Sequence, residues 1–111
     1  MSENIVWSHV KSNLPQISRF KTVVNGKNYL LVLTLSPTEY EINGLLAEIE
    51  YSTERSTHFA NVVRHVGARR YRKGLKAVLA GSVEENRQDQ LRAVYDRFFQ
   101  EWAESLLAEQ P

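Results

Sequence analysis

The chain has 111 residues, no cysteine, 42% hydrophobic residues and a formal net charge of +1. This length fits a single domain over residues 1–111, because two halves would each lie near the lower limit for independent folding. The lack of cysteine excludes disulfides, thiolate zinc sites and a cysteine nucleophile. Glu3 near the start argues against a secretory signal, and the longest apolar run, residues 29–35, is far shorter than the roughly 20 residues of a membrane span. We therefore expect a soluble, cytoplasmic protein.

The first segment, residues 2–14, carries apolar residues at spacings that suit a helix. Pro15 would end that helix, because a proline disfavours helical backbone at the residue before it. We predict a helix here, and a short strand through "NIVW" is the alternative.

The strongest local pattern is "ISRFKTVV-NG-KNYLLVLTL", in which Asn25-Gly26 separates two runs rich in β-branched and aromatic residues. Asn-Gly favours a type I′ turn, because both residues tolerate a positive φ. A hairpin centred on this turn pairs Val24 with Lys27 and Phe20 with Leu31. One of its faces is apolar and needs a helical cover, and a two-stranded ribbon alone is marginally stable in water.

Four further segments are predicted to be helical. "SPTE" begins at Ser36 with the pattern of a capping box, and apolar residues at i, i+3, i+4 and i+7 follow it, so we expect a helix over residues 37–50. A helix ending at Gly67 and another over residues 68–80 come next. A long amphipathic helix over residues 83–108 ends the chain. The expected fold class is α+β, with one β-hairpin packed against four to five helices.

Charge is segregated along the chain even though the net charge is small. Residues 37–54 hold five acids and no Lys or Arg, residues 64–76 hold six Lys or Arg and no acid, and residues 82–111 hold seven acids against three Arg. On a helix over residues 68–80, the basic side chains gather opposite the apolar ones. Such a helix presents a cationic face to solvent.

A cationic face suits a polyanion, so our main hypothesis is a small nucleic-acid-binding protein that contacts the phosphate backbone. Neutralisation of this face by the chain's own acids, an acidic protein surface and an anionic membrane are the alternatives. The candidate nucleic-acid-binding residues are Arg64, Arg69, Arg70, Arg72, Lys73 and Lys76.

Two apolar surfaces appear incomplete in the expected fold, and they favour a homodimer or a protein partner. One is the second face of the hairpin, and the other is the distal half of the last helix, which would overhang a compact domain. A protein-interaction adaptor or regulator that docks its partner through the last helix is the alternative function. The candidate interface residues are Leu30, Val32, Phe99, Trp102 and Leu106.

No pattern in the chain indicates catalysis. His58 follows Glu54 by four residues, but a third ligand on the same helix face is missing, since His65 would lie about 10.5 Å further along the axis. The five glycines form no phosphate-binding loop. Gly44 is expected to mark a close approach between elements. We predict no enzyme activity, no catalytic residue, no metal and no cofactor.

Overall fold

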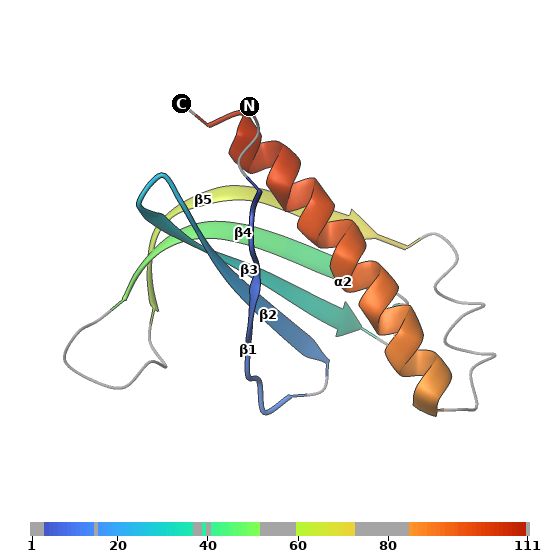
Figure 1. The fold of residues 1–111 in the computed structure, drawn as a ribbon. Helices are drawn as coiled ribbons and strands as arrows, with labels where there is room; N and C mark the ends of the chain where they lie inside the picture. The colour runs from blue at the N-terminus through green and yellow to red at the C-terminus, as the bar shows by residue number, and fades with distance from the viewer. Residues whose placement is uncertain are drawn as a thin grey trace.

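The computed structural model describes residues 4–14, 16–36, 39, 41–51, 60–72 and 85–110. Within these residues the chain forms an antiparallel sheet with the strand order β1-β2-β3-β4-β5 and one helix, α2 (Figure 1). The elements are β1 (Ser8–Val10), β2 (Ile17–Val24), β3 (Lys27–Ser36), β4 (Glu41–Tyr51), β5 (Ala60–Tyr71) and α2 (Glu85–Ala108).

The expected fold class is wrong. The described residues form a five-stranded antiparallel sheet with a single C-terminal helix, not a hairpin under four to five helices. The hairpin and the C-terminal helix are present, and the segments predicted as helices between them contain strands β4 and β5. The α+β class in its many-helix form therefore does not hold for this chain.

The hairpin at Asn25-Gly26 is confirmed in its register and its turn. Val24 lies opposite Lys27 and Phe20 lies opposite Leu31. Asn25 has a φ of 52° and Gly26 a φ of 76°, which are the two positive values that a type I′ turn needs. The apolar face of this hairpin packs under α2, and β4 supplies the third strand that stabilises it.

The segment predicted as a helix over residues 37–50 contains strand β4. Ile42 and Leu46 lie on the sheet face that packs against α2, while Leu45 and Ile49 lie on the opposite face. Apolar residues on both faces of one strand produce the same i, i+3, i+4, i+7 spacing as one face of a helix. Pairing with β3 from Glu41 to Ile49 selects the strand.

Strand β5 replaces the helix predicted to end at Gly67 and the first residues of the helix predicted over residues 68–80. The pairing with β4 shifts register twice, so that Val63 and Val66 have no opposite residue. Two bulges therefore interrupt the alternation of side chains that would have marked a strand in the sequence. Residues 73–80 lie outside the described part of the chain.

The helix expected in residues 2–14 is also wrong. Residues Ser8–Val10 form the edge strand β1, and residues 4–7 have no regular secondary structure. The Trp7 indole donates a hydrogen bond to Glu104 of α2 at 3.0 Å, and the Thr22 hydroxyl donates one to the Val6 carbonyl at 2.8 Å. Contacts to elements distant in sequence, not local periodicity, fix the position of this segment.

Helix α2 closes one face of the sheet, which we call the inner face. Phe99, Ala103 and Leu107 form its most buried line and contact the core residues of β2, β3 and β4. Gly44 of β4 and Gly67 of β5 lie beneath this helix: a Cβ on Gly44 would stand 2.4 Å from Phe99 Cδ1, and one on Gly67 would stand 2.6 Å from Leu106 Cδ1. The close approach expected at Gly44 is confirmed, although it joins a strand to a helix.

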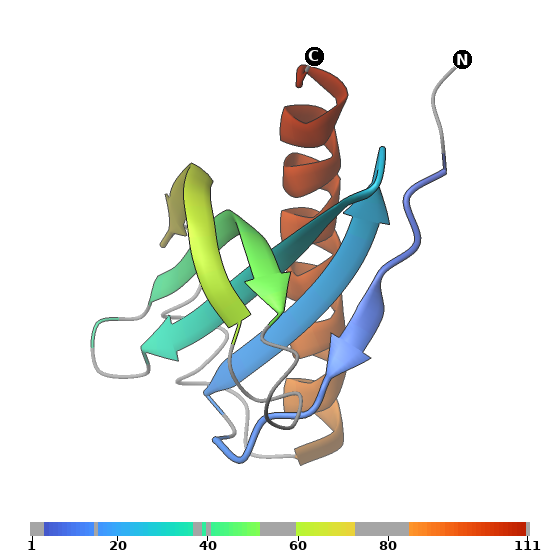
Figure 2. The same ribbon diagram turned by 90° about the vertical axis from the view of Figure 1, so that its left-hand side faces the viewer.

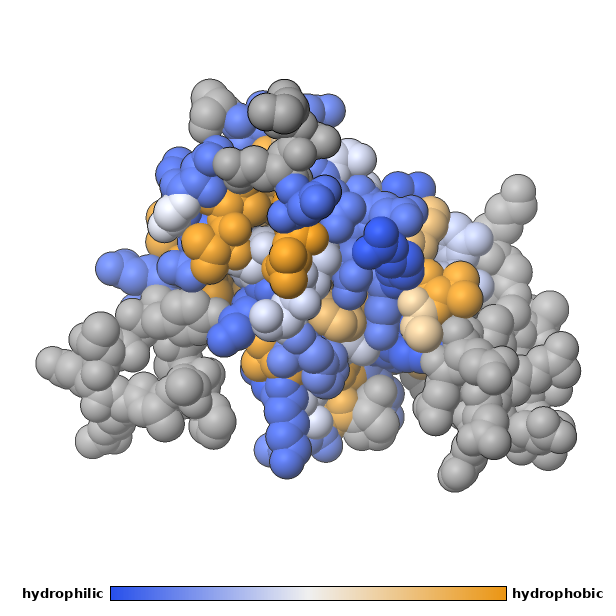
Figure 3. Space-filling model, viewed as in Figure 1, coloured by the Kyte–Doolittle hydropathy of each residue, from blue (hydrophilic) through white to orange (hydrophobic). Residues whose placement is uncertain are grey.

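The described surface is largely hydrophilic in the view of Figure 3, with hydrophobic residues in separate areas. Val94 of α2 is an exposed hydrophobic residue. Within the described residues, no helix combines the length and the apolar character that crossing a bilayer requires.

Candidate functional site

The face of the sheet turned away from α2, here called the outer face, carries the most distinctive surface of the described chain. Figure 2 shows the strands crossing in front of α2, so that this face is turned toward the viewer. Alternation and register place apolar residues at its centre and basic residues toward β2 and β5. Its central and flanking residues include Arg19, Lys21, Leu30, Val32, Leu45, Ala68 and Arg70.

The centre of the outer face is apolar and partly open to solvent. The Leu45 residue is 38% exposed, and Leu30 and Val32 are half-buried by their neighbours in the sheet. The one helix of the described residues lies on the inner face. An antiparallel sheet with one covered face normally alternates apolar and polar side chains, so aliphatic residues on the second face are the exception.

A shallow hollow of about 640 Å³ lies over β3, β4 and β5 on the outer face. Cross-strand pairs form its floor and one wall: Leu45 lies opposite Ala68, and Asn43 lies opposite Arg70. Because Ala68 is small, the sheet surface dips beside Leu45. The residues lining the hollow are Val32, Thr34, Asn43, Gly44, Leu45, Ala68, Arg69 and Arg70.

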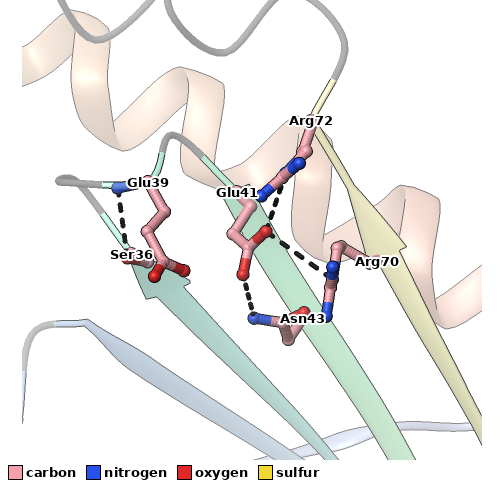
Figure 4. A network of polar contacts seen from close by, with 6 residues as sticks. All are labelled: Ser36, Glu39, Glu41, Asn43, Arg70 and Arg72. Atoms are coloured by element: carbon pink, nitrogen blue, oxygen red, sulfur yellow. Dashed lines mark hydrogen bonds and ion pairs between the residues drawn. The ribbon is translucent and has the colours of Figure 1, made fainter.

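Glu41 is a buried carboxylate at the edge of this hollow (Figure 4). Arg72 Nε donates a hydrogen bond to its Oε2 at 2.9 Å, and Asn43 Nδ2 donates one to its Oε1 at 3.1 Å. Arg70 Nε lies 3.6 Å from the same Oε2. Two arginines therefore share Glu41, and the side chain of Glu39 also lies next to this carboxylate.

This environment lowers the pKa of Glu41 below its ordinary value of 4.5. The largest cause is the hydrogen bond from the Asn43 amide; burial acts in the opposite direction, and the hydrogen bond from Arg72 lowers the pKa further. The carboxylate therefore stays ionised at neutral pH and holds the Arg72 guanidinium in place.

The candidate nucleic-acid-binding residues do not share one face. Arg64 points to the inner side, where its Nε is 2.9 Å from Glu48 Oε1 and its Nη2 donates to Gln110 Oε1 at 2.7 Å. The guanidinium of Arg69 lies 4.7 Å from the centre of the Phe98 ring on α2. Arg70 and Arg72 lie at Glu41 on the outer face, and Lys73 and Lys76 lie outside the described residues.

The cationic helix face expected over residues 68–80 is therefore wrong for its first residues, which continue β5. Successive side chains of a strand lie on opposite faces. On a helix, Arg69 and Arg70 would be only about 100° apart around the axis and would lie on the same side. Each of the four described arginines in residues 64–76 has a partner within the chain, and three of these arginines pair with one of two carboxylates, Glu48 or Glu41.

The candidate interface residues fall into two groups. Leu30 and Val32 lie on the outer face, as a partner surface requires. Phe99 is fully buried in the core, and Trp102 and Leu106 pack against that core from α2. The sheet covers the distal half of α2, so the expected overhang is absent.

Sequence reasoning missed Glu41, Asn43, Leu45 and Ala68 as parts of one surface. Glu41, Asn43 and Leu45 share one face of β4 by alternation, and Ala68 joins them through the β4–β5 register, so the surface requires that both segments be strands. The sequence did contain one local signal: the Ser36 hydroxyl accepts a hydrogen bond from the Glu39 amide at 3.4 Å, as the capping pattern implies. That contact lies in the connection between β3 and β4 and does not begin a helix.

A second polar cluster joins α2 to β2 on the inner side. Arg92 Nε and Nη2 donate to Ser18 Oγ at 3.0 and 2.8 Å, and Arg92 Nε lies 3.4 Å from Asp96 Oδ1. Burial raises the pKa of Asp96 above its ordinary value of 3.8, while Arg92 and Ser18 act in the opposite direction. Because Ser18 accepts hydrogen bonds from a guanidinium, this cluster holds the helix on the sheet and does not resemble an activated nucleophile.

Among the described residues, no group of three or more His, Asp or Glu side chains is arranged to hold a metal ion. Comparisons with models of protein families, with curated proteins and with solved structures found no match to this chain.

Proposed function

We propose that this chain is a non-catalytic protein-interaction domain, an adaptor or regulator, that docks an acidic surface of another protein on its outer face. The observation that carries this proposal is the exposed apolar centre beside the hollow, with Leu45 38% exposed. Aliphatic side chains at the middle of a binding surface are desolvated on docking and contribute most of its affinity.

The charge of the outer face determines the kind of partner. Arg19, Arg70 and Arg72 are cationic residues on its strands and directly after β5, and the carboxylate of Glu41, with Glu39 next to it, opposes the last two. A partner with carboxylates around an apolar centre is complementary to this pattern. A second copy of the chain would bring the same positive charge to the interface, so this face is unsuited to a homodimer.

Nucleic acid is the second candidate, and one observation favours it. Arg70 and Arg72 share one carboxylate, and their side chains are 63% and 62% exposed. Against it, the aromatic rings that the structure describes on β3, β5 and α2 lie in the core or pack against it, so they offer no stacking surface for a base. Backbone contact alone would give weak, salt-sensitive binding without sequence preference.

A random-peptide display library, selected on the folded protein, tests the proposal. We expect enriched peptides to combine Asp or Glu with aliphatic residues. Their binding should survive in Val23→Asp but not in Leu45→Asp, because Val23 lies on the same face outside the hollow. The two variants introduce the same charge, so charge alone does not account for a difference.

Two outcomes would contradict the proposal. One is enrichment of peptides that bind the Leu45→Asp variant as tightly as the unchanged protein. The other is tight binding of labelled single-stranded DNA or RNA that Leu45→Asp leaves intact and Arg70→Gln with Arg72→Gln abolishes, which would assign the face to nucleic acid.

A further inference from the structure

We propose, on the basis of the function proposed above, that the hollow recognises one carboxylate and one aliphatic side chain two residues apart in an extended peptide. In this arrangement Arg70 selects the carboxylate. The floor formed by Leu45 and Ala68 takes the aliphatic side chain. The inference follows from three features of the hollow: the weak engagement of Arg70, the order of the cross-strand pairs, and the open shape.

Arg70 and Arg72 make different contacts with Glu41. Arg72 Nε is 2.9 Å from Glu41 Oε2 and forms a hydrogen bond, whereas Arg70 Nε is 3.6 Å away, too far for one. Asn43 satisfies the other oxygen of Glu41. The carboxylate therefore has a donor at each oxygen without Arg70.

Arg70 is thus held near the hollow by charge attraction while its guanidinium stays accessible. Its side chain is 63% exposed, and it lines the hollow, which Arg72 does not. A guanidinium offers five N–H donors in a planar fork that matches a carboxylate. A partner carboxylate at the mouth of the hollow could take up these donors without displacing Arg72 from Glu41.

The cross-strand pairs set the spacing that the hollow recognises. The pair of Asn43 and Arg70 is separated from the pair of Leu45 and Ala68 by two residues along each strand. At about 3.3 Å per residue, the two pairs are roughly 6.6 Å apart. Side chains at positions i and i+2 of an extended peptide have the same spacing and point to the same side.

The shape of the hollow favours a peptide over a small molecule. Its volume of about 640 Å³ falls within the range of ligand pockets. However, it lies open on the surface of three strands, and pockets for small molecules usually enclose most of the ligand. A peptide lying along the strands fills such a hollow with two side chains and leaves its backbone at the surface.

A pair of synthetic peptides tests this inference on the full chain. The first is a capped Ser-Glu-Ser-Leu-Ser peptide, and the second replaces Glu with Gln. Binding is followed by ¹H–¹⁵N chemical shifts of the protein, including the arginine Nε–H signals. We expect shifts at Leu45, Ala68 and Arg70, and an affinity about three- to fivefold higher for the Glu peptide, as for an exposed ion pair.

Two variants distinguish binding of the peptide carboxylate by Arg70 from attraction by the overall charge of the protein. Arg70→Gln should remove the preference for Glu over Gln. Arg64→Gln changes the net charge equally and lies on the same strand, but on the inner side, so it should keep the preference. Ser-Glu-Leu-Ser, which places the two side chains on opposite sides of an extended chain, should bind more weakly than the spaced peptide.

The outcomes distinguish this inference from the proposed function. Equal affinities for the Glu and Gln peptides, with binding still lost in Leu45→Asp, would overturn the role of Arg70 and leave the docking face standing. Shifts confined to other surfaces, or none in the hollow at millimolar peptide, would overturn the subsite. If no library-selected peptide binds the outer face, the proposed function is overturned as well.

Discussion

The ring of Phe99 lies directly over Gly44, so closely that a Cβ on Gly44 would stand 2.4 Å from Cδ1 of the ring. Phe99 is fully buried at the centre of α2, and Gly44 also lines the hollow on the opposite side of the sheet. At this position the sheet is only one backbone thick between the core and the hollow. The packing of the helix and the shape of the outer face are therefore linked through one residue.

Replacing Gly44 with alanine should destabilise the fold. The new methyl group overlaps Phe99, which has no exposed surface toward which to move. Overpacking of this kind typically costs about 1–3 kcal/mol. We expect a lower urea midpoint with an unchanged slope.

The matched control for this substitution is the same change in a Phe99→Leu background. A smaller side chain on α2 leaves room for the methyl group, so Gly44→Ala should cost less there than in the unchanged protein. An equal cost in both backgrounds would show that the ring is not the cause.

The turn between β2 and β3 should be sensitive to the residue type at Gly26. Its φ of 76° strains any residue with a Cβ, although asparagine tolerates such values better than alanine. Gly26→Ala should destabilise the chain by about 1 kcal/mol, and Gly26→Asn should cost less. Thermal unfolding of the two variants gives the comparison, and a reversed order would argue against the type I′ turn.

Glu41 should make the stability of the chain fall on acidification. The pKa of Glu41 in the folded chain lies below the unfolded value of 4.5. Its contribution to the free energy of unfolding is therefore complete above pH 4.5 and is lost as the pH falls through the folded pKa. Glu41→Gln should therefore be less stable than the unchanged protein at neutral pH, and this difference in stability should shrink as the pH falls below 4.5. Urea unfolding of both proteins at neutral pH and well below pH 4.5 measures this difference in the free energy of unfolding. A difference that does not change with pH would contradict the conclusion that the ionised carboxylate of Glu41 stabilises the fold.

Asp96 should have the opposite effect. Its folded pKa lies above the unfolded value of 3.8, so the folded chain binds more protons between those values and becomes more stable as pH falls through them. Asp96→Asn should be more stable than the unchanged protein at neutral pH, and the gain should vanish below 3.8.

The control for Asp96 is Glu101→Gln on the same helix. Glu101 also pairs with an arginine one turn away, Arg97 at 3.3 Å, but both side chains are exposed. An exposed pair contributes about 0.3–0.5 kcal/mol, so this variant should be slightly destabilised and show no gain at neutral pH. A gain in both variants would mean that the burial of Asp96 is not the cause.

The hairpin and the last helix could be predicted because their signals are local. Asn25-Gly26 determines the turn, and the strand register follows from it. Strand β4 could not be distinguished from a helix, since its apolar residues lie on both faces and mimic a helical period. Such a strand is identified by its neighbours in the sheet, which the sequence does not show.

The candidate site was predicted only in part for the same reason. Leu30 and Val32 followed from the hairpin register and lie on the outer face. The cluster of Lys and Arg in residues 64–76 is evident in the sequence, but a helix over residues 68–80 would place its arginines on one side. In the strand, Arg64 and Arg70 lie on opposite faces. Arg64 pairs with Glu48 on the inner face, and Arg70 pairs with Glu41 on the outer face.

The most direct test of the docking proposal is to map where a library-selected acidic peptide binds, by ¹H–¹⁵N chemical shifts of the full chain. We expect the largest shifts at Val32, Leu45, Ala68 and Arg70 on the outer face, with the exposed residues Val94 and Arg97 of α2 unchanged. Shifts concentrated on Trp102 and Leu106, with the hollow unaffected, would contradict the account.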